Sequence, residues 1–113
     1  MSKEVQRGVN AVLVARLKDT TGAYVSPDQA PVITALSVNG TDKLGVVAAT
    51  IAQATDEAGQ PIVGHYNITV PTAGLQYNDQ VDIEAAAVVE GFETQVNKDF
   101  TVSSDASRRP VFY

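Results

Sequence analysis

The first residue to test for chemistry is His65, the single histidine of the chain. Tyr66, Ile68 and Val70 follow it at every second position, and this alternation places His65 on the outward side of a strand. A Ser-His-Asp relay would need a serine and an aspartate to converge on that solvent-facing surface. The pattern favours an ordinary surface histidine, and we expect the protein not to be an enzyme.

Two small groups of acidic residues invite comparison with metal sites. Asp79 and Asp82 lie close to Asn78, and Asp56 is followed by Glu57. Ca²⁺ takes about six to eight oxygen ligands, and neither group has the Asp-x-Asp-x-Asp-Gly spacing of an EF-hand loop. The chain has no cysteine, so thiolate metal sites and disulfides are excluded. Solvated turn carboxylates are the simpler interpretation, and we expect neither a metal nor another cofactor.

Composition bounds the class of protein. The chain has 113 residues, with 13 acidic and 8 basic side chains and a net charge of -5. This length suits one domain, and the negative charge argues against direct nucleic-acid binding, which needs clustered Lys and Arg. No apolar run approaches the ~20 residues of a membrane-spanning helix. We therefore expect a single domain that contacts neither nucleic acid nor membrane.

The elements that position these residues are short strands, because apolar and polar residues alternate along most of the chain. The predicted strands cover residues 10–18, 31–38, 46–52, 65–70, 81–89 and 92–102. In the second of these we expect Val32, Leu36 and Val38 to face inward, ahead of an Asn39-Gly40 turn. In the last, Phe92, Val96, Phe100 and Val102 share the inward side. The spacing predicts an all-β sandwich.

Several segments carry a family resemblance: VLVARLKDTTGAYVSP, PVITALSVNG, GHYNITVP, NDQVDIEAAAVVEG and DFTV. The chain resembles the immunoglobulin-like or transthyretin-like modules of bacterial surface proteins and of small bacteriophage structural proteins. The matching features are the turn at residues 19–22, the Pro27-Asp28 pair and the strand at residues 64–71. The resemblance covers about residues 10–102. It implies an Ig-like β-sandwich of about seven antiparallel strands, with extended arms at residues 1–9 and 103–113.

A lone module that starts at Met1 without cysteines, tandem repeats or a signal-peptide core favours the phage members of this group. The resemblance then implies a virion structural protein, assembled in the host cytoplasm. We expect a capsid decoration or cement subunit that binds the major capsid protein lattice and stabilises the head. The alternatives are a neck, tail or fibre adaptor of the virion, and a carbohydrate- or host-surface-binding module.

Candidate partner-binding residues come from apolar side chains at outward positions. Val12 and Val14 in the first predicted strand, and Ala86 and Val88 in the fifth, stand where polar side chains are expected. Either the arms or a twisted sheet edge cover them within the monomer, or another subunit does. The second interpretation predicts a homo-oligomer or a lattice-bound protein.

A further set of candidate contacts lies near the end of the sequence. Two cations precede three apolar residues in a Ser-rich stretch: Arg108, Arg109, Val111, Phe112 and Tyr113. Such a segment suits an acidic, partly apolar partner surface, because its charges pair with carboxylates and its rings bury area. The alternative is a disordered tail without a partner.

Overall fold

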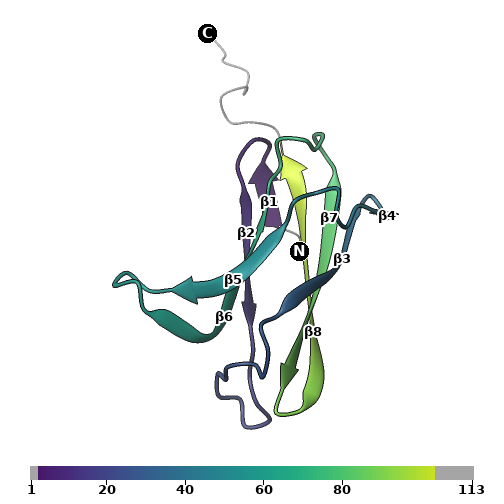
Figure 1. Cartoon of the computed structure of the whole chain (residues 1–113). Helices are drawn as coiled ribbons and strands as arrows, with labels where there is room; N and C mark the ends of the chain where they lie inside the picture. The colour runs from purple at the N-terminus through teal and green to yellow at the C-terminus, as the bar shows by residue number, and fades with distance from the viewer. Residues whose placement is uncertain (1–2, 104–113) are drawn as a thin grey trace.

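The computed structural model describes residues 3–103, and all regular secondary structure in this range is β-strand. The strands are β1 (Lys3–Gln6), β2 (Ala11–Arg16), β3 (Val32–Val38), β4 (Thr41–Asp42), β5 (Thr50–Thr55), β6 (Pro61–Val70), β7 (Gln80–Val89) and β8 (Phe92–Ser103). They form two sheets, with strand orders β1-β8-β7-β3-β4 and β2-β6-β5 (Figure 1). The predicted all-β, two-sheet architecture is confirmed. In the described range no helix is long and apolar enough to span a membrane.

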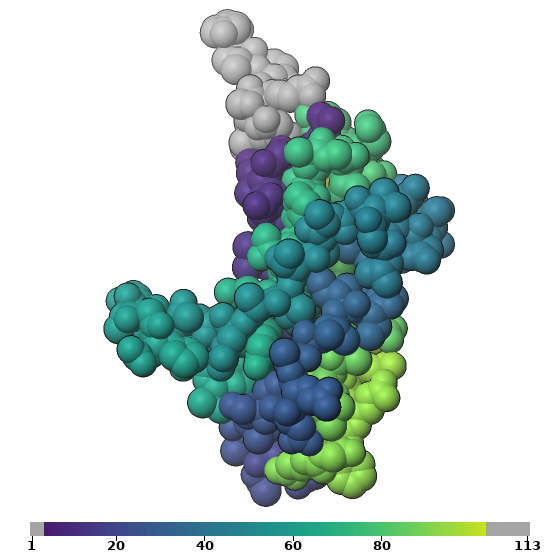
Figure 2. Space-filling view, viewed as in Figure 1, coloured from purple at the N-terminus to yellow at the C-terminus, as the bar shows by residue number. Residues whose placement is uncertain are grey.

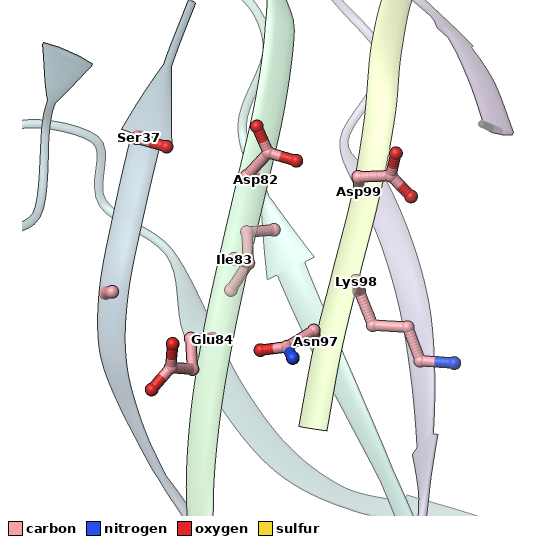
Figure 3. A pocket seen from close by; sticks show the side chains of 8 residues that line it. Ser37, Asp82, Ile83, Glu84, Asn97, Lys98 and Asp99 are labelled. Atoms are coloured by element: carbon pink, nitrogen blue, oxygen red, sulfur yellow. The ribbon is translucent and has the colours of Figure 1, made fainter. Parts of the chain in front are cut away.

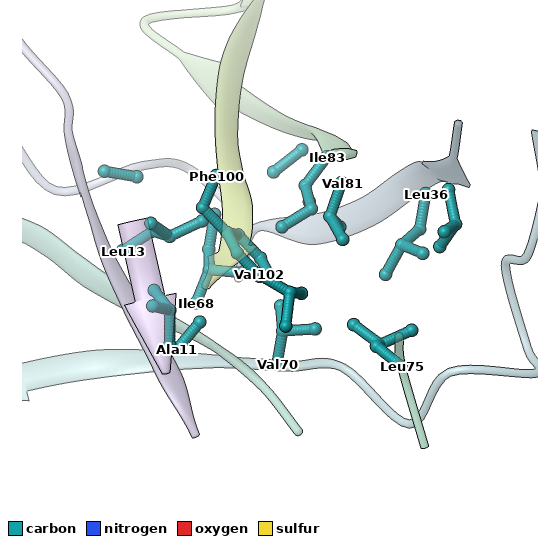
Figure 4. Packing of buried hydrophobic residues seen from close by; sticks show 14 residues of the cluster. Ala11, Leu13, Leu36, Ile68, Val70, Leu75, Val81, Ile83, Phe100 and Val102 are labelled. Atoms are coloured by element: carbon teal, nitrogen blue, oxygen red, sulfur yellow. The ribbon is translucent and has the colours of Figure 1, made fainter. Parts of the chain in front are cut away.

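The core lies between the two sheets and follows the alternation seen in the sequence, except at the start of β8. Phe92, which the sequence predicts to face inward, is 75% exposed, because it lies next to the β7–β8 turn at the end of its sheet. On β2, Ala11, Leu13 and Ala15 are buried, while the residues between them are half-buried or exposed. Phe100 of β8 is fully buried and packs with aliphatic side chains from both sheets, including Leu13 and Ile68 (Figure 4). Burial of these apolar side chains is the main force that holds the sheets together.

β3 departs from the predicted pattern at a β-bulge. Register shifts between Ile33 and Ala35, so that Ile33 pairs with inward-facing Ala85, and Val32 pairs with Ala86. The prediction that Val32 faces the core is wrong, because the extra residue at the bulge reverses the side on which the preceding residues point. Val32 is 56% exposed as a result.

β5 begins later than the sequence suggests. The amides of Val46 and Val47 both donate hydrogen bonds to the Lys43 carbonyl, which makes residues 46–49 a loop, and β5 runs on to Thr55. Within this loop Val47 and Ala49 still pack against the core, together with Ile51. Alternate residues of the predicted strand therefore still face the core, although the strand itself begins and ends later than predicted.

The segment expected to form an N-terminal arm contains a strand. Residues 3–6 form β1, which pairs in parallel with the end of β8, whereas all other strand pairs are antiparallel. Val5 is buried in the core. The fully buried Thr72 holds the following turn, because its hydroxyl accepts from the Gly8 amide at 2.8 Å and donates to the Val9 carbonyl at 2.7 Å.

Glycine is favoured at two positions for different reasons, a positive φ at Gly40 and a close backbone contact at Gly64. In the predicted turn after β3, Asn39 and Gly40 have φ angles of 53° and 83°, which this dipeptide adopts readily. At Gly64 the chain passes against the backbone of a neighbouring segment: a Cβ there would lie 2.7 Å from the Leu17 carbonyl oxygen and 3.0 Å from that of Val25. The approach admits only glycine.

The β5–β6 hairpin stands out from the body of the molecule (Figures 1 and 2). Its tip is the turn at Asp56, whose carboxylate accepts hydrogen bonds from the amides of Ala58 and Gln60, both at 2.9 Å. Asp28 ties the loop before β3 to the β7–β8 turn, because its carboxylate accepts a hydrogen bond from the Gly91 amide at 2.8 Å. The predicted turns at residues 56–59 and 26–28 thus have structural roles.

Candidate interaction surfaces

The four predicted contact residues on strands lie on opposite faces of the sandwich. Val12 and Val14 alternate with the buried residues of β2, so they face outward from the three-stranded sheet. Ala86 and Val88 alternate with the buried residues of β7 and face outward from the five-stranded sheet. The structure therefore does not bring the two pairs together, and each pair belongs to a separate surface.

The outer face of the three-stranded sheet mixes apolar and uncharged polar side chains with Arg16. None of its three strands contains an aspartate or glutamate. Val12, 42% exposed, pairs with Thr69, and the half-buried Val14 pairs with Asn67. Arg16, which pairs with His65, continues this outward row along β2. We define the Val12 face as the outward residues of β2 and β6.

On the other outer face, Ala86 and Val88 border a shallow hollow of about 160 Å³. It is lined by Gln29, Ala30, Val32, Ala86, Ala87, Val88 and Glu93. The bulge in β3 turns Val32 towards this side, beside Ala86. Sequence reasoning identified two of its apolar members but missed Val32, because a bulge leaves no period-two signal.

Towards the start of β7, the outward positions of the same face hold carboxylates and not apolar side chains. Asp82 and Asp99 are direct cross-strand partners, and Ser37 pairs with Asp82 from the other side (Figure 3). Glu84 lies in the next row, opposite Asn97. These residues border a hollow of about 330 Å³.

Further acidic side chains lie on the outer face of the five-stranded sheet, on both sides of the apolar hollow. The outward positions of this sheet hold the acidic residues Glu4, Asp42, Asp82, Glu84, Glu93 and Asp99. By register, no lysine or arginine occupies an outward position of these five strands. Lys98, which has the inward parity, extends away from Asp82 and Glu84 (Figure 3). We call this surface the acidic face.

A third surface is an apolar groove between β3 and the segment that leads from β4 into β5. Its volume is about 460 Å³, and it is lined by Pro31, Val32, Ile33, Leu44, Gly45, Val47, Ala48, Ala49 and Ile51. No charged side chain lines it. The groove exists because the loop at residues 46–49, and not a strand, covers this side of the core.

His65 lies in an aromatic cluster. Its Nδ1 is 2.8 Å from the Val63 carbonyl oxygen, and its ring centroid is 4.4 Å from that of Tyr24. The Lys18 ammonium lies 5.1 Å from the Tyr24 ring centroid. Tyr24 is 45% exposed, so this cluster forms a small cationic and aromatic platform.

The acidic groups compared with metal sites serve turns in the structure. Asp79 accepts hydrogen bonds from the Asn39 side-chain amide and the Gln76 backbone amide, both at 2.8 Å. Asp56 caps the hairpin turn described above. Among residues 3–103, no three histidine or acidic side chains gather in a way that would hold a metal ion.

The remaining predicted contacts, Arg108, Arg109, Val111, Phe112 and Tyr113, lie outside the described residues. Comparison with protein-family models, curated proteins and solved structures finds nothing that matches this chain. What the protein does must therefore be argued from its own surfaces.

Proposed function

We propose that this protein is a bacteriophage virion structural protein, a decoration or cement subunit that binds the major capsid protein lattice and stabilises the head. The observation that carries the proposal is that apolar contact residues occupy both outer faces of one sandwich. A module with two such faces is suited to bridging two neighbouring proteins. Many weak bridges of this kind strengthen one another on a repeating lattice.

The strand order supports an immunoglobulin-like module. In Ig domains, one sheet contains strands B, E and D, and the other contains C, F and G, extended by C′ in variable-type domains. If β2 to β8 are taken in chain order as B, C, C′, D, E, F and G, the two sheets become B-E-D and G-F-C-C′. The C-terminal arm at residues 103–113 remains part of the proposal, whereas residues 3–6 of the expected N-terminal arm form β1.

Reconstitution onto phage heads assembled without this protein tests the proposed function. We expect the added protein to bind in many copies and to raise the temperature and lower the salt concentration at which heads break open. The double variant Val12→Ser with Val14→Ser should bind about tenfold more weakly, because it removes apolar contact area from the Val12 face.

A matched control is Val46→Ser, since Val46 is 75% exposed but lies in the β4–β5 loop, outside the Val12 face. It should bind heads as the unmodified protein does. Heads that resist heat equally with and without the protein would rule out the cement role.

The Tyr24 cluster favours a second candidate, a carbohydrate-binding module. An exposed ring beside a cation and a histidine offers a stacking surface for a sugar. Glycan binding that is lost in Tyr24→Ala, without any effect on heads, would replace the capsid proposal with this one.

A further inference from the structure

The acidic face changes character along β7 in a way that a segment of this same chain matches. Asp82 and Glu84 are followed by Ala86 and Val88, so carboxylates give way to apolar side chains along a single strand. Beside Ala86, Val32 adds to the apolar half and the hollow lies open to solvent. A ligand for this surface needs a cationic part and an apolar part in the same order.

Residues 108–113 have that order and that spacing. Arg108 precedes Phe112 by four residues, as Glu84 precedes Val88. In extended chains four residues span about 13 Å, so both pairs of groups align at once. Pro110 biases Arg109 towards extended backbone conformations, which suits a segment that lies along a strand. Guanidinium groups also pair well with carboxylates at such a surface.

The reach of the chain decides which copy supplies the segment. From Ser103 the chain would first have to reverse, which takes at least about two residues and leaves about seven, or roughly 23 Å, before Phe112. Gln95, the partner of Ala86, lies eight residues back along β8, about 27 Å away, and Val88 lies farther still. The segment of the same molecule falls short, whereas that of a neighbour has no such limit.

We infer that residues 108–113 of one copy bind the acidic face of a second copy, with Arg108 on Glu84 and Phe112 in the hollow beside Val88. The contact is heterologous, because it joins two different surfaces, and it therefore links copies head to tail, in closed rings or in open chains. This goes beyond the proposed function and does not depend on it, since it concerns the isolated protein.

Sedimentation of the full chain tests the inference without any capsid. We expect dimers and longer species to grow between about 10 µM and about 1 mM protein, and to shrink when NaCl rises from about 0.05 to about 0.5 M. Asp82→Lys with Glu84→Lys, and separately Arg108→Glu with Arg109→Glu, should each weaken association at least tenfold. Phe112→Ser should do the same.

Mixing the two charge-reversed proteins gives the decisive result. Each repels itself, but the reversed face of one matches the reversed segment of the other, so the mixture should associate again. The control Asp56→Lys with Glu57→Lys makes the same charge change at the β5–β6 hairpin tip and should associate like the unmodified protein. A full chain that stays monomeric up to about 1 mM, or a mixture that stays monomeric, overturns the inference.

Discussion

Gly64 is the one glycine of the chain at which an added Cβ would contact another segment. With φ at 73° and two carbonyl oxygens within 3.0 Å of the place where a Cβ would stand, it packs β6 directly on the segment from Leu17 to Val25. Gly59, in the hairpin turn, has a similar φ of 80° but open space around it. Substituting both glycines therefore distinguishes the cost of steric overlap, present only at Gly64, from the cost of a positive φ, present at both.

We predict that Gly64→Ala lowers the free energy of unfolding by about 2–4 kcal/mol, from strain and overpacking together. Gly59→Ala should cost about 1–2 kcal/mol, from the positive φ alone. Urea denaturation of both variants measures the difference. Equal losses would show that the close approach at Gly64 relaxes without cost.

Asp19 carries a prediction about pH. The Thr21 hydroxyl, donating at 2.6 Å, is the largest cause that holds the pKa of Asp19 below its ordinary value of 3.8, and the backbone amides of Thr21 and Ala23 add to it. A lowered pKa means that the folded state favours the carboxylate. The turn is therefore stabilised above the ordinary pKa and loses this contribution as pH falls through the lowered value.

Thr21→Ala should raise the pKa of Asp19 towards its ordinary value, because it removes the hydroxyl donor. Carboxyl-carbon NMR titration measures this shift. The neighbouring Thr20→Ala makes the same chemical change without touching Asp19 and should leave the pKa unchanged; a pKa unmoved in both variants would contradict the assignment.

At the scale of elements, the turn after β1 is held by a buried side chain from another segment. Thr72 links the β6–β7 connection to the turn after β1 through its hydroxyl, which accepts from the Gly8 amide and donates to the Val9 carbonyl. A valine at this position keeps the shape but leaves both backbone groups unsatisfied.

We predict that Thr72→Val destabilises the protein by about 1–3 kcal/mol and speeds hydrogen exchange of the Gly8 amide. Thr72→Ser keeps the hydroxyl and should preserve the protection of that amide, although it removes a buried methyl group. Amide exchange by NMR distinguishes the two. If Gly8 exchanges equally fast in both variants, the hydroxyl does not hold the turn.

At the scale of the whole molecule, charge is distributed unequally between the two outer faces. The acidic face holds six carboxylates at outward positions, and the strands of the other sheet hold none. Asp82 and Asp99 lie directly opposite one another, and like charges in this position are unfavourable, while the Gln80 side-chain amide donates a hydrogen bond to the Asp99 carboxylate at 3.1 Å. A cationic partner would offset the repulsion between these two carboxylates.

Asp82→Asn should therefore raise the free energy of unfolding by about 0.2–1 kcal/mol, and added salt should raise it less in the variant than in the unmodified protein. Asp56→Asn removes one charge at the hairpin tip, keeps the oxygen that caps the turn, and should have a smaller effect. Thermal melts at two salt concentrations measure both. A loss of stability in Asp82→Asn would show that the carboxylate is stabilising.

Alternation and turn chemistry in the sequence predict the all-β class, the buried ends of β6 and β8, and the Asn39-Gly40 turn. These follow from period-two alternation and local turn chemistry, which need no knowledge of distant contacts. The folded structure is needed to see that Val12 and Ala86 lie on opposite faces, that Val32 points outward, and that Asp82 lies opposite Asp99. Strand order, register and bulges join residues far apart in the chain, and no local pattern encodes that pairing.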